Sequence, residues 1–346
     1  MSLAYDIIPV TLVTGFLGSG KSTLLADVLT GDAARDTAVL VNEFGEVGLD
    51  HLLMGEVDTQ TVLLDNGCVC CSIRGELKDA LAGLFSKRAR GDVPPFSRVV
   101  IETTGLATPA PIIATLLADL VIRSHYELKV TITVVDALNA DAQRARYPEW
   151  LAQISATDRI MISKGDLTTA PHIDALKQSL RTINPFAEIV ERNSSPDALR
   201  ELLFKPARFA PDSVQSVCEI GAGTVRLGKG GGRLAHRVDF ERSDIVSSCI
   251  RIEDPLDWQV FTLWFTMLLN RHGDKILRVK GLLALEGADR PAVLHAVQHL
   301  VHPVLHLEEW PDASRASTLV FITEGLDGAV IEASYRRFCA ALKVAA

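Results

Sequence analysis

A short apolar run that leads directly into a glycine-rich loop is the feature that most constrains the fold of this chain. Residues 7–15 (IIPVTLVTG) are rich in β-branched side chains, and residues 15–23 (GFLGSGKST) fit the pattern G-x-x-x-x-G-K-[ST]. The helical sequence LLADVL follows at 24–29. A strand, a loop and a helix in this order predict a phosphate-binding loop in an α/β domain.

Each residue type in this loop has a chemical task. The glycines let consecutive backbone N–H groups curl around phosphate oxygens, and the helix N-terminus adds its dipole. Lys21 supplies a positive charge at the β- and γ-phosphates, and Ser22 is the expected ligand of Mg²⁺. We therefore predict that Lys21 and Ser22 are catalytic and that the nucleotide is bound by Gly15, Gly18, Ser19, Gly20, Lys21, Ser22 and Thr23.

A second motif follows the apolar run RVVI, where Glu102 precedes Thr103, Thr104 and Gly105. A carboxylate at a strand end is also typical of a solvated end or a helix cap, so the phosphate loop upstream decides its interpretation. We predict that Glu102 holds the magnesium ion or its water and is catalytic, and that Gly105 belongs to the nucleotide site.

A third motif, Ser163-Lys164-Gly165-Asp166, follows the apolar run RIMI and indicates the base-recognition turn of a GTPase. Asp166 would accept hydrogen bonds from guanine N1 and N2, and the Lys164 stem would pack on the ring. This motif favours GTP over ATP. The usual first residue is Asn, and the shorter Ser163 predicts a hydrogen bond weakened by about 1 kcal/mol and a looser base site.

Three cysteines, Cys68, Cys70 and Cys71, lie together in the turn between the first two motifs. Their sulfurs can converge on one zinc-like ion, and the helical pattern that follows lowers thiol pKa values. Three thiolates leave the fourth tetrahedral position open, which suits a site that gives up its metal. A redox switch and a buried thiol run are the alternatives. The other cysteines, Cys218, Cys249 and Cys339, are scattered, as packing residues are.

Seven β-branched, strand-like runs alternate with helical patterns as far as residue 205, which predicts a mostly parallel sheet. The runs are IIPVTLVTG, TAVLVNE, QTVLLDN, RVVIE, VTITVVDA, RIMISKGD and AEIVE. We predict a P-loop GTPase domain at 1–205 that includes the CxCC metal loop, a glycine-rich linker at 206–246 and a smaller α+β domain at 247–346. The second domain should contain an amphipathic helix from Trp258, a helix from about Pro291 and a terminal helix.

The formal net charge of −8 argues against a bare nucleic-acid partner, which requires a basic surface. We find no signal peptide and no membrane span in the sequence, so we expect a cytoplasmic protein. In that reducing compartment we do not expect disulfides.

The motifs GFLGSGKST, VNEFGEVGLD, GCVCCS, ETTG and SKGD, followed by ILRVKGLL, together resemble the CobW family of GTPases, relatives of HypB and UreG. The resemblance covers nearly the whole chain. It implies a GTPase domain, a smaller C-terminal domain and metal binding by Cys68, Cys70 and Cys71. It also makes residues 41–45 the switch segment, with Glu43 and Glu46 as candidates for contacting the γ-phosphate and magnesium. Many members have a histidine-rich linker, whereas this one contains a single histidine, His236.

On a helix, His295, His299 and His302 would share one face and could bind metal, although Pro303 beside them breaks helices and a polar interface is the alternative. The leading hypothesis is a GTPase metallochaperone with GTP, Mg²⁺ and Zn²⁺ as ligands. Its expected partners are a client metalloprotein and, as an option, a second copy of the chain. The alternatives are a P-loop phosphotransferase with a structural zinc loop and a GTPase regulated by thiol oxidation.

Overall fold

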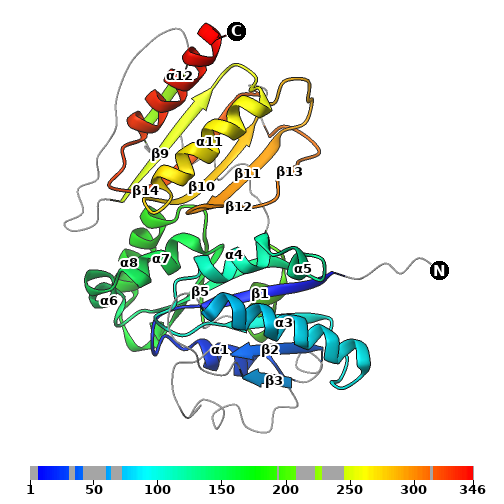
Figure 1. Cartoon of the computed structure of the whole chain (residues 1–346). Helices are drawn as coiled ribbons and strands as arrows, with labels where there is room; N and C mark the ends of the chain where they lie inside the picture. Colours follow the sequence, from blue (N-terminus) through cyan, green and yellow to red (C-terminus); the bar gives the residue numbers. More distant parts are fainter. Residues whose placement is uncertain are drawn as a thin grey trace. The chain divides into compact units, whose positions relative to one another are not determined.

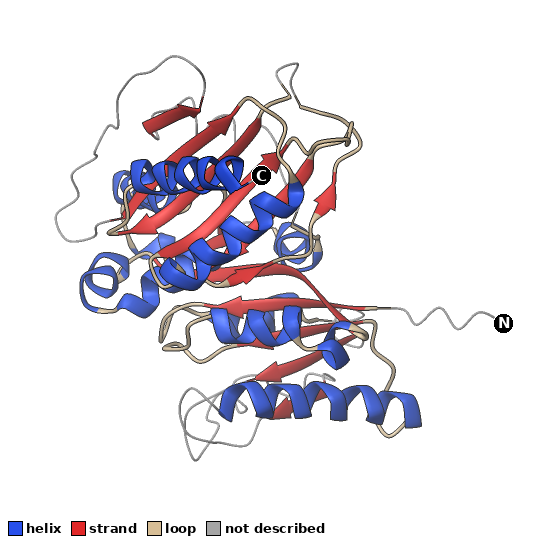
Figure 2. Ribbon diagram, turned by 45° about the horizontal axis from the view of Figure 1, so that its top comes forward, coloured by secondary structure: helices blue, strands red, loops and turns tan. Residues whose placement is uncertain are grey.

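The computed structural model describes residues 7–30, 36–41, 60–63, 72–192, 195–207, 223–227, 245–311 and 315–345 (Figure 1). The chain divides into two compact units, each with its own sheet (Figure 2). The first unit consists of Met1–Ser179 and Ala187–Ala207, and the second of Leu180–Phe186 and Arg208–Ala346. The predicted fold class, a parallel α/β domain followed by a smaller α+β domain, is confirmed.

The first sheet has the strand order β3-β2-β4-β1-β5-β6-β7, and every neighbouring pair is parallel. All seven β-branched runs noted in the sequence form strands. They are β1 (Ile8–Thr14), β2 (Thr37–Val41), β3 (Gln60–Leu63), β4 (Arg98–Glu102), β5 (Tyr126–Asp136), β6 (Arg159–Ser163) and β7 (Glu188–Glu191).

Helices follow most of these strands, as parallel connections require. Helices α1 (Lys21–Val28) and α9 (Pro196–Phe204) pack together on the sheet, where their leucines share a core cluster with Val13, Val100 and Val134. The remaining helices of this unit are α3 (Ser72–Arg90), α4 (Ala110–Ala118), α5 (Leu120–Arg123), α6 (Ala140–Arg146), α7 (Pro148–Ala156), the 3₁₀ turn η2 (Gly165–Leu167) and α8 (Ala170–Ile183), whose last residues belong to the second unit.

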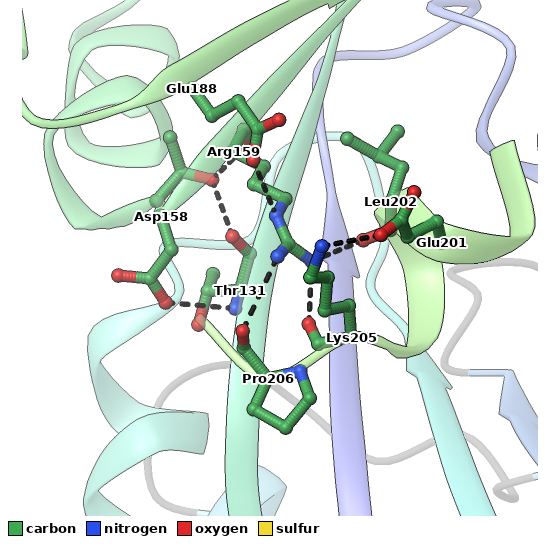
Figure 3. A network of polar contacts seen from close by, with 9 residues as sticks. Thr131, Asp158, Arg159, Glu188, Glu201, Leu202, Lys205 and Pro206 are labelled. Carbon is green, nitrogen blue, oxygen red and sulfur yellow. Dashed lines mark hydrogen bonds and ion pairs between the residues drawn. The ribbon is translucent and has the colours of Figure 1, made fainter. Parts of the chain in front are cut away.

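A buried arginine fixes the end of the first unit (Figure 3). Arg159, at the start of β6, is 5% exposed and donates to the carbonyl oxygens of Leu202 (2.6 Å) and Lys205 (2.6 Å). It also donates to the Glu188 carboxylate at 3.0 Å and to the Pro206 carbonyl at 3.4 Å. Because these carbonyls follow or end α9, one guanidinium ties the end of that helix to the sheet.

The second sheet has the order β12-β11-β10-β14-β9-β8, with β13 paired to β11. All its pairs are antiparallel except β8 with β9. Strand β8 lies inside the segment 206–246 that we predicted as a linker, so part of that segment belongs to this sheet. The strands are β8 (Gly223–Leu227), β9 (Ile245–Ile252), β10 (Ile276–Leu283), β11 (Ala292–Val297), β12 (Leu300–Val301), β13 (Leu305–His306) and β14 (Ser317–Glu324).

Helices α11 (Trp258–His272) and α12 (Gly328–Ala345) lie across one face of this sheet (Figure 1). The buried face of α11 packs Phe261, Trp264 and Phe265 into the same cluster as Phe321 of β14. This apolar contact is the core of the second unit. No helix in the described ranges is both long and apolar enough to cross a bilayer.

The helix predicted from about Pro291 is wrong, because residues 292–301 form two strands of a hairpin. Strand β11 pairs with β10 over five residues, and Ala292, Leu294 and Ala296 enter the core at a spacing of two. Gln298 adopts a left-handed conformation with a φ of 51° at the turn. Pairing with a strand already present in the sheet outweighs the local helical spacing.

Candidate nucleotide and metal site

The motifs meet because parallel strands end at a common edge of the sheet. Val13 of β1 lies beside Glu102 of β4, and Asp136 of β5 lies beside Ser163 of β6. The loops that leave these four strands therefore face the same region.

The first loop has the backbone geometry of a phosphate cradle. Gly15, Gly18 and Gly20 have φ angles of 143°, 69° and 95°. A Cβ at Gly15 would lie 2.4 Å from the Val134 carbonyl oxygen, so only glycine fits where the loop crosses β5. Helix α1 begins at Lys21, and its N-cap residue is Gly20, which has no side chain to cap the helix. The N-terminus of the helix can therefore offer backbone N–H groups to an anion such as phosphate.

Lys21 is 8% exposed, and its side chain folds back over the loop. Its Nζ atom donates to the carbonyl oxygens of Gly15 (2.9 Å) and Phe16 (3.2 Å). The ammonium group is thus held within the loop, at the position from which it can contact phosphate oxygens that the loop encloses.

Ser22 and Glu102, predicted from separate motifs, meet directly. The Ser22 hydroxyl donates to Glu102 Oε1 at 2.7 Å, and Glu102 is 4% exposed. A hydroxyl and a buried carboxylate beside a phosphate loop form the hard-oxygen donor set that Mg²⁺ prefers. The residues present therefore fit a magnesium ion, which Ser22 and Glu102 would hold.

The segment after Glu102 packs closely on the phosphate loop. A Cβ at Gly105 would lie 2.4 Å from the backbone nitrogen of Leu17, so glycine is required at this contact. The hydroxyl groups of Ser19 and Thr104 are buried and have no hydrogen-bond partner within the described part of the chain. Buried hydroxyl groups without a hydrogen-bond partner in the protein are expected where a polar ligand supplies that partner.

A residue that the sequence analysis missed holds this segment in place. Gln153 of α7 is fully buried, and its Nε2 atom donates to the carbonyl oxygens of Gly105 (3.1 Å) and Ala107 (3.0 Å). The sequence gives no signal for this role, since a glutamine in an amphipathic helix resembles a surface residue.

Ser163 braces the base-recognition turn in spite of its short side chain. Its hydroxyl donates to the Ser19 carbonyl oxygen at 2.6 Å and lies 3.2 Å from the Val135 carbonyl oxygen. The 2.6 Å contact shows that β6 approaches the phosphate loop closely enough for serine to reach it. The predicted looser binding of the base stays a prediction.

Lys164 connects three elements of the site. Its Nζ atom donates to the Gly18 carbonyl oxygen at 2.8 Å and to Asp136 Oδ2 at 2.7 Å. Burial would raise the pKa of Asp136, but the hydrogen bond from Lys164, with those from Asn139 and the Leu138 N–H, holds this pKa below its ordinary value. Asp136 was also missed; its position at the end of an apolar strand is the signal that could have found it.

The two remaining predicted side chains are exposed. Thr23 lies in the first turn of α1, and Asp166 lies in the 3₁₀ turn after β6. An exposed Asp166 carboxylate beside Lys164 is free to accept hydrogen bonds from a base, as the motif predicts.

Residues 9–191 match the family described as CobW/HypB/UreG, nucleotide-binding domain, and residues 245–339 match the cobalamin synthesis protein CobW C-terminal domain. The chain belongs to the CobW/HypB/UreG family. The zinc chaperone YjiA of Escherichia coli strain K12 is 34% identical over 328 residues, which are 95% of this chain and 98% of that protein.

One further relative and one solved structure are informative for this CobW-family chain. The zinc-regulated GTPase metalloprotein activator 1 of Schizosaccharomyces pombe is 35% identical over 193 residues, 54% of this chain and 46% of that protein. A crystal structure of the Zn(II)-bound YjiA GTPase from Escherichia coli has a TM-score of 0.69 and 28% identity, and the match covers 96% of this chain and 99% of that one.

The predicted metal and switch residues of this CobW-family chain, Cys68, Cys70, Cys71, Glu43 and Glu46, lie outside the described residues. Within the described ranges, no group of three or more histidine, cysteine or acidic side chains could hold a metal ion. The three-cysteine site therefore stays a prediction.

The histidines of the CobW C-terminal domain do not share a helical face. His295 of β11 stacks on His302 with ring centroids 4.0 Å apart, whereas His299 lies 3.0 Å from the Asp274 carboxylate. The hairpin brings His302 opposite His295, whose carbonyl oxygen accepts from the His302 N–H at 2.9 Å, and it leaves His299 in the turn between β11 and β12.

The expectation of no disulfides is also corrected. Cys249 of β9 is buried and disulfide-bonded, whereas Cys339 is free.

Proposed function

We propose that this chain is a GTP-hydrolysing metallochaperone. It binds a transition metal, with zinc as the first candidate, through Cys68, Cys70 and Cys71, and it couples GTP binding and hydrolysis to delivery of that metal to a client protein. Membership of the family and the zinc chaperone names of its relatives support the proposal.

The register of the first sheet is the observation that most favours this coupling. Val41, the last residue of β2, lies beside Leu63, the last residue of β3, and also beside Glu102, the last residue of β4. The cysteine segment follows Leu63 and the switch segment follows Val41. Since neighbouring strands are about 4.8 Å apart, Leu63, the last described residue before the cysteine segment, lies about 10 Å from Glu102.

A change at the phosphates therefore has a short path to the metal loop. In our proposal, the γ-phosphate orders the segment that contains Glu43, and that segment contacts the cysteine loop beside it. Three thiolates hold zinc with one position open, so a small change in loop geometry alters the affinity for the metal. Loss of the γ-phosphate then releases the ion to a client with a better ligand set.

Hydrolysis of GTP in this proposal depends on how the protein positions the phosphates and stabilises their negative charge. Lys21 and the loop N–H groups stabilise the charge that develops on the phosphate oxygens, and Ser22 and Glu102 hold the magnesium ion. Magnesium, when bound, supplies neutralisation of the β- and γ-phosphate oxygens.

The test is a chelator-competition titration of zinc into the reduced protein with GTP and Mg²⁺, with GDP and Mg²⁺, and without nucleotide. We expect the zinc affinity to differ at least tenfold between the GTP and GDP states, which is about 1.4 kcal/mol of coupling. Equal affinity in all three states would contradict the coupling.

Variants assign the metal site in the same titration. The double variant Cys70→Ala, Cys71→Ala should lose the tight zinc site. Cys339→Ala is the matched control, because Cys339 is a free cysteine in α12 of the other unit. Unchanged zinc affinity in the double variant would remove the cysteine loop from the proposal.

A further inference from the structure

Asp136 is a buried carboxylate at the nucleotide edge of the sheet to which the proposed function assigns no role. Its side chain is 2% exposed, and it accepts hydrogen bonds from Lys164 Nζ (2.7 Å), Asn139 Nδ2 (2.8 Å) and the Leu138 N–H (2.9 Å). A buried carboxylate is costly unless a cation and good hydrogen bonds compensate it. The base-recognition turn supplies that cation.

The geometry of Lys164 depends on this pairing. Its backbone is left-handed, with a φ of 57°, and its side chain extends from the end of β6 to the phosphate loop. One ammonium group thus bridges the Gly18 carbonyl oxygen and the Asp136 carboxylate. With both ends fixed, the aliphatic stem is held in place, and a side chain that is 34% exposed can still offer apolar surface to a base.

A purely structural role is the alternative for Asp136. Its contacts with Asn139 and the Leu138 N–H would stabilise the turn after β5 by themselves. An asparagine at position 136 could still accept from the Leu138 N–H. It would carry no negative charge, however, and of the two acceptors of the Lys164 ammonium in the described part of the chain only the Gly18 carbonyl oxygen would remain unchanged. The negative charge of Asp136 is therefore needed to hold Lys164 but not to stabilise the turn after β5.

We propose that Asp136 is a positioning residue for recognition of the guanine base. It acts through Lys164, whose stem it holds ready for the base while it ties the turn at Ser163–Asp166 to the phosphate loop. This inference rests on the proposed function, because it requires a guanine nucleotide in the site. It assigns a part of base recognition to a residue 28 positions before Lys164 in the sequence.

The experiment measures GDP and IDP affinity for the full-length protein by calorimetry. Asp136→Asn should weaken both nucleotides about tenfold, because Lys164 contacts the face of the ring that the two bases share. Asp166→Ala should instead reduce the preference for GDP over IDP, since inosine lacks the N2 amino group. In a Lys164→Met background, Asp136→Asn should have no further effect.

Two controls separate positioning from folding. Asn139→Ala removes a partner of Asp136 without touching Lys164 and should leave the affinity within twofold of the unaltered protein. Asp141→Asn changes an exposed carboxylate on α6 and should have no effect. If Asp136→Asn proves insoluble, Asp136→Glu keeps the charge and should retain more affinity than Lys164→Met.

Three results would overturn the inference. The first is a nucleotide affinity of Asp136→Asn equal to that of the unaltered protein. The second is that Asp136→Asn weakens binding as much in the Lys164→Met background as it does in the unaltered protein. The third is a loss in Asn139→Ala as large as that in Asp136→Asn, which would assign Asp136 to the turn alone. Failure of the unaltered protein to bind any guanine nucleotide would overturn the proposed function, and this inference with it.

Discussion

In the first sheet every described strand runs parallel to its neighbours, whereas the second sheet is antiparallel apart from the pair of β8 and β9. In the first sheet this places Gly15, Glu102, Asp136 and Ser163, which come from four different strand ends, around one site. In the second sheet, hairpins separate side chains that are close in sequence, so His295 contacts His302 while His299 contacts Asp274.

One buried region of each unit differs from the other in the side chains that fill it. The edge of the first sheet buries charged and polar side chains such as Lys21, Glu102 and Asp136, whereas the face of the second sheet under α11 buries aromatic rings. Buried charge requires hydrogen bonds from particular neighbours, and aromatic packing requires only volume and shape. The comparison indicates that chemistry is concentrated in the first unit and predicts different responses to substitution.

The largest expected effect is on hydrolysis by the first unit. Lys21→Ala removes the ammonium group held at the phosphate loop and should lower kcat/KM for GTP about a thousandfold, or about 4 kcal/mol. Lys129→Ala, which removes an ion pair with Glu127, is the matched control and should be near neutral. Steady-state phosphate release measures both. A loss below tenfold for Lys21→Ala would contradict the assignment of the loop.

Phe321→Ala tests whether the second unit is mainly a packed core. Phe321 is fully buried against Phe265, and its truncation should destabilise the protein by about 3 kcal/mol. Urea unfolding measures this loss. The GDP affinity of Phe321→Ala, measured without denaturant, should stay within twofold of that of the unaltered protein. A tenfold loss would contradict the assignment of nucleotide binding to the first unit alone.

Arg159→Met tests the polar interior of the first unit. The substitution keeps most of the volume but leaves the carbonyl oxygens of Leu202 and Lys205 without their donor, so we expect a loss of about 2 to 3 kcal/mol. Arg90→Met is the control, because Arg90 is exposed and forms an ion pair with the nearby, exposed Asp92. The free energy of unfolding in urea distinguishes them.

The smallest predicted effect is a pH dependence that originates in the second unit. Burial, with the nearby charges of His302, Arg278 and Lys280, lowers the pKa of His295 well below 6.5. The unfolded chain therefore binds a proton that the folded chain does not, and stability should fall as the pH drops below about 6.5, by at most about 1.4 kcal/mol per pH unit.

The carboxylate of Asp136 behaves differently, because its depressed pKa gives stability that is lost only as the pH falls through the lower folded value. Thermal unfolding between pH 7.5 and 5 should show a slope that His295→Asn reduces and that His306→Asn, an exposed control, does not. The same slope in all three proteins would show that His295 is not its source.

Much of the first unit could be predicted from the sequence. The seven β-branched runs became the seven strands, and the loop at 15–23 has the expected glycine conformations. These features are local, since alternation, β-branching and the glycine requirement act over a few neighbouring residues. The pairing of Ser22 with Glu102 was also expected, because their motifs name complementary ligands of one ion.

The segment from Pro291 shows where local patterns fail. Its histidine spacing fits a helix, but the free strand edge of β10 was available for pairing and the segment became β11 and β12. Likewise, the glycine-rich segment 206–246 contains β8, which pairs with β9. Strand partners are set by the whole sheet, so the sequence of one segment cannot specify them.

The sequence by itself determined the nucleotide loop and the succession of strands and helices in the first unit, because each depends on residue types within one short segment. The tertiary structure decided that Ser163 reaches Ser19, that Gln153 holds the segment after Glu102 and that Asp136 holds Lys164. These contacts join residues 28 to 144 positions apart. They depend on strand order and register, which arise only when the sheet has assembled.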